Sequence, residues 1–262
     1  MRKKVKGKCR ICGEIGELTF EHVPPHAAFN NKSVKILEGM DAISKALVSD
    51  KSGRIQQKGM GAYTLCGKCN NNTGAWYGNS FVNWCIQGME ILKRSEGKPS
   101  LIYIHYLYPL RIIKQIIAMF FSVNGEDFKD KNQELVKFIL NKEKKYLDKK
   151  YRIFCYFNCE GGGRSTGIMS SIQTDQSFSL TFKKPIIMSE FSFPPFGYLM
   201  TFNSEPPDDR LFEITHFANY GYDEFKVMSL DLKVLPTYLA YAGDYRKYSE
   251  IMKQREDSIR KM

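Results

Sequence analysis

The chain has 262 residues, of which 43% are hydrophobic, and a formal net charge of +11. This length and composition allow a sizeable core in one large or two modest domains. No run of 18 apolar residues is present, which argues against a transmembrane helix, and the basic N-terminus lacks the apolar segment of a secretory signal. We therefore expect a soluble cytoplasmic protein with no membrane partner.

Most of the positive charge lies in the first third of the chain. Residues 1–100 contain 16 Lys and Arg against 8 Asp and Glu, a net +8, whereas residues 101–262 contain 23 against 20, a net +3. A basic surface attracts polyanions because binding releases their counterions. The charge is therefore compatible with nucleic-acid binding, and equally with a lysine-rich composition that serves only solubility.

Four of the seven cysteines form two CxxC pairs, CRIC and CGKC, separated by 53 residues. Each pair can place two thiolates on one metal ion, and two pairs complete a tetrahedron. Glycine and basic residues flank both pairs, which is typical of exposed knuckles; the alternative is four unrelated buried or redox-active cysteines. We predict one structural Zn²⁺, held by Cys9, Cys12, Cys66 and Cys69. Four sulfur ligands leave no open position for chemistry at this ion.

The remaining cysteines do not suggest ligands. Cys155 and Cys159 belong to the segment CYFNC, whose neighbours resemble those of a strand. Since free cysteines are often buried, we predict that both are core residues.

A strand, a long insert, a second strand and a helix are expected around the knuckles. GELTFEHVPP predicts a strand over residues 17–20 that runs into Glu21 and His22 and is stopped by two prolines. GAYTL predicts a strand over residues 61–65. The following NNNT is a good helix start, and apolar residues then recur at helical spacing.

The insert between the strands is basic and poorly patterned. Its segment KSGRIQQKGMG favours a loop or hairpin that grips a nucleic-acid backbone, although a solvated surface loop explains the same composition. The candidate DNA-binding residues are Lys51, Arg54, Lys58 and Lys68.

This order of elements resembles the HNH nucleases, which have a ββα-metal fold and here a four-cysteine zinc. The matching segments are CRIC, FEH, LCGKC and NNNTG, and the resemblance covers roughly residues 8–95. The sequence departs from the family pattern twice. Glu21 stands where aspartate is more usual, and Asn70 stands where many members have histidine. A related phage junction resolvase has asparagine at the second position, so that departure looks permitted.

The resemblance implies a metal-dependent phosphodiester hydrolase. Glu21 and Asn70 would bind a catalytic Mg²⁺ or Mn²⁺, because such hard cations prefer oxygen ligands. His22 would be the general base, since histidine has a suitable pKa. His26 and Asn71 are further catalytic candidates; His26 can instead cap the loop, and any of the asparagines can instead cap the helix.

The composition changes at residues 95–100, where we place a domain boundary. Residues 1–98 would form the HNH-like nuclease domain and residues 99–262 an α+β accessory domain for specificity, oligomerisation or regulation. PLRIIKQIIAMFFSV predicts a helix with an apolar stripe, NQELVKFILNKEKKYL a second, and YRKYSEIMKQREDSIRKM a polar C-terminal helix. Strands are predicted at YRIFCYF, STGIMSS, SFSLTF, PIIMSEFSF and GYLMTF, and GGGRSTG is interpreted as a hairpin turn.

The sequence therefore predicts an α+β protein that acts as a DNA endonuclease, with DNA as its partner. By association, small proteins of this kind occur in prokaryotic defence or mobile-element modules, where a homodimer or an operon partner is conceivable. Two alternatives stay open: a zinc-stabilised nucleic-acid-binding protein without cleavage activity, and a regulatory protein whose function lies in the C-terminal part.

Overall fold

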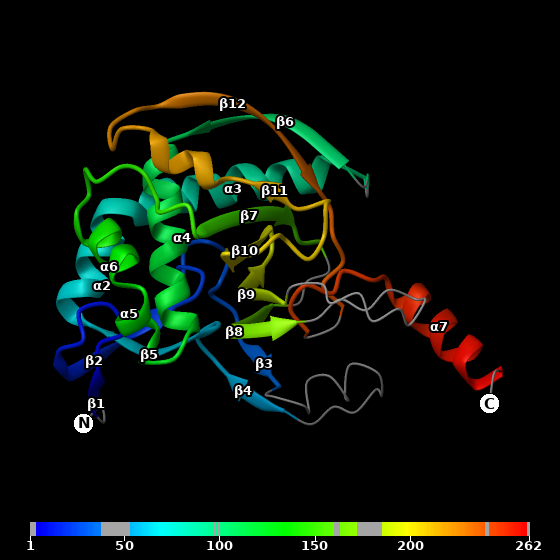
Figure 1. Cartoon of the computed structure of the whole chain (residues 1–262), viewed down its shortest axis with the longest axis horizontal. Coiled ribbons are helices and arrows are strands. Elements are labelled where there is room, and N and C mark those ends of the chain that lie inside the picture. The colour runs from blue at the N-terminus through cyan, green and yellow to red at the C-terminus, as the bar shows by residue number, and fades with distance from the viewer. Residues whose placement is uncertain are drawn as a thin grey trace.

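The structure is a computed structural model. Within the part of the chain that it describes, helices and strands are mixed, which confirms the predicted α+β class (Figure 1). No described helix combines the length and the apolar character that crossing a membrane requires. The predicted strand SFSLTF and the candidate Lys51 lie outside the described residues. The described residues are 4–37, 53–96, 98, 100–159, 163–171, 185–238 and 241–260.

The first part of the chain forms a small antiparallel sheet with the strand order β1-β2-β5. Both strands predicted here are present, and the central strand is longer than expected because it continues to His22. The short first strand, which the sequence did not indicate, pairs with its neighbour along its whole length. The basic insert contains a two-stranded hairpin. The bounds are β1 Val5–Lys8, β2 Ile15–His22, β3 Val34–Ile36, β4 Arg54–Gln56 and β5 Gly61–Cys66.

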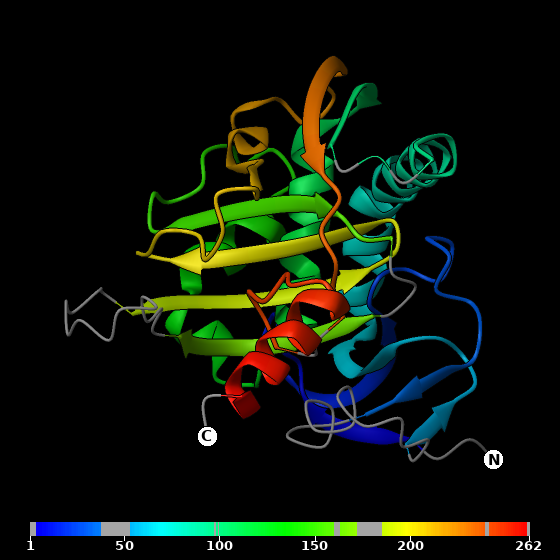
Figure 2. The same cartoon turned by 90° about the vertical axis from the view of Figure 1, so that its right-hand side faces the viewer.

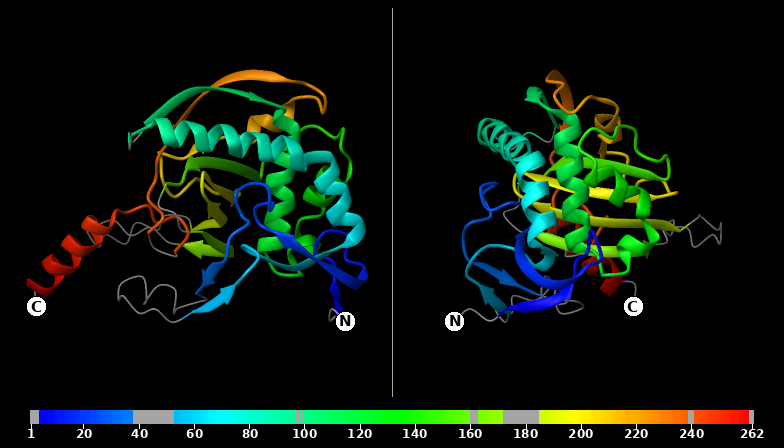
Figure 3. Two further views of the ribbon diagram at one scale, coloured as in Figure 1. Left: turned by 180° about the vertical axis from the view of Figure 1, so that it is seen from behind. Right: turned by 90° about the vertical axis from the view of Figure 1, so that its left-hand side faces the viewer.

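A bent helical run follows β5 without a loop, as Figure 3 shows. The predicted start near Asn70 is too late, because the helix begins directly after Cys66. Its first turn brings Cys69 back toward Cys66, so the three asparagines lie inside the helix and do not cap it. The run consists of α2 Gly67–Thr73, the π-helical turn η1 Gly74–Gly78 and α3 Asn79–Arg94.

A five-stranded antiparallel sheet occupies the centre of the molecule, with the order β11-β7-β10-β9-β8. Figure 2 shows this sheet face on. Helix α4, Pro109–Val123, packs against its far face and has the predicted bounds. Most of its side chains are buried, so it is a core helix and not one with a single apolar stripe. The strands are β7 Tyr151–Phe157, β8 Arg164–Ser171, β9 Ile186–Phe193, β10 Phe196–Phe202 and β11 Phe212–Glu213.

A long two-stranded ribbon, β6 Ser100–Leu107 with β12 Lys226–Lys233, crosses above α3 in Figure 1. The sequence did not predict it, because its strands are more than a hundred residues apart. The other face of the central sheet is covered by the chain that follows β12, which leads to the projecting C-terminal helix. The remaining helices are α5 Phe128–Lys131, α6 Gln133–Leu140, η2 Thr215–Asn219 and α7 Tyr248–Arg260.

Three further details of the prediction were wrong. Helix α6 stops at Leu140, where its apolar residues end and Lys114 Nζ donates to the carbonyls of Phe138 and Asn141, at 2.8 and 2.5 Å. Cys155 is buried as predicted, but Cys159 is exposed because it lies beyond the end of β7. The interpreted turn GGGRSTG becomes strand from Arg164 onward.

The predicted domain boundary falls between α3 and β6, but the hydrophobic core is continuous across it. Trp84 on α3 is fully buried, donates from Nε1 to the hydroxyl of Tyr198 at 2.8 Å, and stacks on Phe196 at 4.7 Å. Gly88 allows this approach, since a Cβ there would lie 2.3 Å from the Phe196 ring. Residues 1–98 are therefore not an independent packing unit.

Candidate functional site

The four predicted zinc cysteines come from two short knuckles. Cys9 and Cys12 lie in the turn between β1 and β2, where the Gly13 amide donates to the Cys9 carbonyl at 2.8 Å and Gly13 takes a φ of 81°. Cys66 ends β5, and Cys69 lies in the first turn of α2. The β2–β5 pairing brings the two knuckles together.

The sulfur atoms form a compact cluster. All four Sγ atoms lie within 4.8 Å of one another, and the Cys12 and Cys66 sulfurs are 3.8 Å apart. A tetrahedral Zn²⁺ with Zn–S bonds of about 2.3 Å requires sulfur separations of about 3.8 Å. The hydrogen bond from Cys69 lowers the pKa of Cys9 to about 4, and burial raises the pKa of Cys12 to about 11. The cluster can therefore hold a metal ion.

The first knuckle is also fixed to the central part of the molecule. The Arg10 guanidinium donates to the carbonyls of Ser122 and Asn124 at the end of α4, both at 2.7 Å. A bulge in β5 leaves Thr64 without a cross-strand partner, and its hydroxyl donates to Ser122 Oγ at 2.9 Å. The cysteine cluster and its sheet are thus attached to α4 by polar contacts.

Glu21 presents a buried carboxyl at the end of β2. Only 8% of its surface is exposed, and among the described residues no hydrogen bond or ion pair to its carboxyl is present. Burial raises the pKa of Glu21 to about 7. A buried carboxyl without a partner is costly when ionised, so this position favours the arrival of a cation.

His22, the last residue of β2, has its ring fixed by the backbone of the insert. Its Nε2 lies 2.8 Å from the Lys58 carbonyl oxygen. Because a carbonyl can only accept, Nε2 carries the proton and Nδ1 is left as the basic nitrogen. Burial lowers the pKa of His22, which favours this neutral form. The exposed His26 contacts the same ring, with centroids 5.3 Å apart.

Asn70 lies against β2, whereas Asn71 is exposed. Asn70 Nδ2 donates to Thr19 Oγ1 at 3.0 Å, and within the described residues Oδ1 makes no hydrogen bond. Side chains alternate along a strand, so Thr19 and Glu21 share the face of β2 on which Asn70 lies. His22 points to the opposite face. The structure therefore places Glu21 and Asn70 on one side of the strand end and His22 on the other.

Asn30 is a site residue that the sequence did not indicate. It is fully buried, and its Nδ2 donates to the carbonyls of Pro24 and Met60, each at 2.7 Å, while its Oδ1 accepts from the Met60 amide at 2.6 Å. These bonds tie the loop after β2 to the segment that carries the Lys58 carbonyl. Asn30 thus supports the carbonyl that orients His22.

The described basic candidates lie on the surface. Arg54 on β4, Lys58 before β5 and Lys68 on α2 are all exposed. Lys58 joins the site through its backbone carbonyl, which contacts His22. Because these side chains are exposed, binding of a polyanion to them would not desolvate a buried charge.

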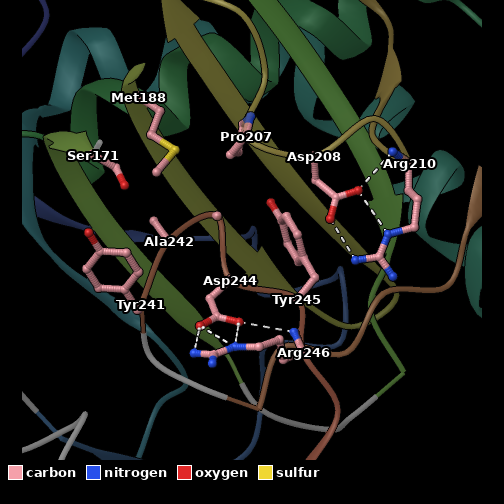
Figure 4. A pocket seen from close by; sticks show the side chains of 11 residues that line it. Ser171, Met188, Pro207, Asp208, Arg210, Tyr241, Ala242, Asp244, Tyr245 and Arg246 are labelled. Atoms are coloured by element: carbon pink, nitrogen blue, oxygen red, sulfur yellow. Dashed lines mark hydrogen bonds and ion pairs between the residues drawn. The ribbon is translucent and has the colours of Figure 1, made fainter. Parts of the chain in front are cut away.

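A pocket of about 260 Å³ lies elsewhere, on the face of the central sheet that α4 does not cover (Figure 4). Two ion pairs line it, Asp208 with Arg210 and Asp244 with Arg246. Within each pair the aspartate neutralises the charge of the arginine. Beneath it, Glu190 is fully buried and accepts from Arg164 at 2.8 Å. The pocket shares no residue with the strand end at Glu21 and His22.

No family model, curated protein or solved structure matches this chain.

Proposed function

We propose that this protein is a metal-dependent DNA endonuclease of the HNH type. The observation that carries the proposal is the imidazole of His22, held by a backbone carbonyl in the tautomer of a base. It is next in sequence to Glu21, whose buried carboxyl lies on the other face of β2 and has no partner among the described residues. A strand end that serves only as a solvated turn has no need of either arrangement.

The four-cysteine cluster would hold a structural Zn²⁺. Its sulfur separations fit a tetrahedral zinc, and four thiolates leave no position for water. Since Cys9 and Cys66 flank the two strands that carry the site, this ion would fix the register of β2 against β5. Its role would be to hold the strand end in shape.

The catalytic cation would be Mg²⁺ or Mn²⁺, held by the Glu21 carboxylate and the Asn70 Oδ1. These are the hard oxygen ligands that such ions prefer. When bound, the ion supplies charge stabilisation at the phosphate and the leaving oxygen. Its arrival would also keep Glu21 ionised, which resolves the cost of burying that carboxyl. Asn70 suits this role better than Asn71, because only Asn70 faces β2.

His22 would activate water from the other side of the strand end. Nδ1 accepts a proton from the water whose oxygen attacks phosphorus, and the bond to the leaving oxygen breaks as the new P–O bond forms. The Nε2–H bond to the Lys58 carbonyl stabilises the imidazolium that results. A phosphate bound across the end of β2 would lie between the cation on the Glu21 face and the water activated by His22 on the other face.

Plasmid cleavage tests this proposal. Wild-type protein should cut in the presence of Mg²⁺ or Mn²⁺, and His22→Ala should lower the rate by roughly two to four orders of magnitude, the range for loss of a general base. Glu21→Ala and Asn70→Ala should raise the cation concentration needed, and Asn71→Ala is the matched control. An effect of Asn71→Ala without one of Asn70→Ala would show that the ligand assignment is wrong by one position.

The same assay separates the alternatives. A DNA complex without cleavage, unchanged by His22→Ala, would favour a zinc-stabilised binding protein. Absence of DNA affinity would favour a regulatory function in residues 99–262. Retention of full activity by His22→Ala would refute the proposed mechanism even if DNA is cut.

A further inference from the structure

A row of aromatic rings crosses the face of the β2–β5 pair that carries His22. The Tyr63 ring contacts the Phe20 ring, with centroids 5.4 Å apart, and Phe20 contacts His22 at 4.9 Å. His22 contacts His26 at 5.3 Å. All three contacts are edge-to-face, so the four rings form a continuous chain that ends beside the proposed base.

The row is open to solvent at both ends and beside His22. At one end of the row Tyr63 is 46% exposed, and at the other end His26 is also exposed. The position opposite His22 on β5 is Gly61, which has no side chain to cover the ring. A Cβ at Gly61 would lie 2.2 Å from the Glu21 carbonyl oxygen, so close strand contact keeps this position free of a side chain.

The segment of the chain that carries most of the row is basic in its described residues. Between His22 and Thr73, the described residues include five basic side chains and no acidic one. All five are exposed: Lys32, Lys35, Arg54, Lys58 and Lys68. A surface with aromatic rings among basic residues is complementary to nucleic acid whose base faces are accessible.

We propose that the substrate strand is unpaired where it crosses this face, and that its bases stack on the Tyr63 and His26 rings. In a regular duplex the base faces are covered by their neighbours, so half-exposed rings on the sheet have nothing to stack against. An unpaired strand exposes those faces, and the exposed basic side chains of the same segment would attract its phosphates. This inference rests on the proposed nuclease site and names its substrate class.

Binding to the full chain tests the inference without cleavage. Fluorescence anisotropy would compare a labelled oligothymidylate of about 12 nucleotides with a labelled duplex of equal length, with no Mg²⁺ or Mn²⁺ added. Tyr63→Leu, which removes the ring and keeps an apolar side chain, should weaken single-strand binding roughly 5- to 150-fold, the range for one stacked base. Tyr63→Phe, which keeps the ring, should bind like wild type.

Tyr106→Leu is the matched control, because Tyr106 is also exposed, at 57%, but lies on the distant ribbon. Equal weakening of both ligands by Tyr63→Leu, no weakening of either, or tighter binding of the duplex by wild type would overturn the inference. Oligouridylate in place of oligothymidylate shows whether the unpaired strand is RNA or DNA.

Failure of the inference and failure of the proposed function give different results. Single-strand binding that depends on Tyr63, with no cleavage after Mg²⁺ is added, would reject the nuclease and leave the stacking surface in place. Cleavage that depends on His22, with single-strand binding insensitive to Tyr63→Leu, would do the reverse.

Discussion

Replacing Asn30 by alanine should disturb the proposed base without touching it. The change removes three short hydrogen bonds: two donated to the carbonyls of Pro24 and Met60, and one accepted from the Met60 amide. Each such bond contributes on the order of 1 kcal/mol net, and leaving backbone groups unpaired adds to the loss. We therefore expect Asn30→Ala to lower the free energy of unfolding by roughly 2–4 kcal/mol.

The effect on activity should exceed what stability explains. With the loop released, the Lys58 carbonyl no longer holds Nε2 of His22 at 2.8 Å, and the ring loses its fixed tautomer and direction. Misplacement of a catalytic group by about 1 Å can cost roughly 100-fold in rate. We expect kcat to fall by about 10- to 100-fold with KM nearly unchanged, at a temperature where the variant is folded.

Denaturant unfolding, cleavage kinetics and ¹⁵N NMR of the His22 ring would measure these effects. In wild type the ring nitrogens should show a protonated Nε2 and an unprotonated Nδ1, and in Asn30→Ala the two forms should mix. Asn31→Ala is the control, since Asn31 is the exposed neighbour. A destabilised variant with wild-type kcat and an unchanged His22 tautomer would refute the reasoning.

Four further outcomes are expected. Native protein should contain one zinc per chain by elemental analysis, and Cys66→Ser should lose the zinc and lower the melting temperature. The pKa of His105 is lowered to about 4 by burial, so stability should fall by about 3 kcal/mol as pH drops from 6.5 to below 4, and the loss should be absent in His105→Phe, as measured by denaturant unfolding. DNA affinity should fall with salt at a log–log slope of roughly −3 to −6, and a flat dependence would mean that the charge serves only solubility. A chain ending at residue 98 should be unfolded by circular dichroism, and a cooperative thermal transition would contradict this.

The cysteine cluster and the strands around it were accessible from the sequence because their signals are local. Each CxxC pair is a short turn, and His22 is followed by two prolines that stop the strand. Helix α4 was equally accessible, since its apolar residues persist over its whole length. Short patterns of this kind predict structure well because the residues that determine each turn or helix are neighbours in the chain.

The groups that orient the candidate site residues could not be predicted from the sequence. The Lys58 group that contacts His22 is a backbone carbonyl, and every residue has one. Asn30 resembles any loop asparagine until the loop brings Met60 beside it. The β6–β12 ribbon was missed for a related reason, because pairing between strands so far apart leaves no pattern within either. Sequence patterns therefore indicated the candidate side chains more readily than the groups that orient them.

The hydrophobic core is shared between residues 1–98 and residues 99–262, so the second part of the chain also supports the candidate site. Tyr77 donates to the Ile139 carbonyl at 2.7 Å, and Trp84 packs between the helical run and the central sheet. Because α2 and α3 are one continuous run, the orientation of Asn70 depends on this packing as well as on the cysteine cluster. Residues 99–262 therefore hold the proposed ligand in place whatever else they do, and their influence on substrate choice must be sought with surface variants of the full chain.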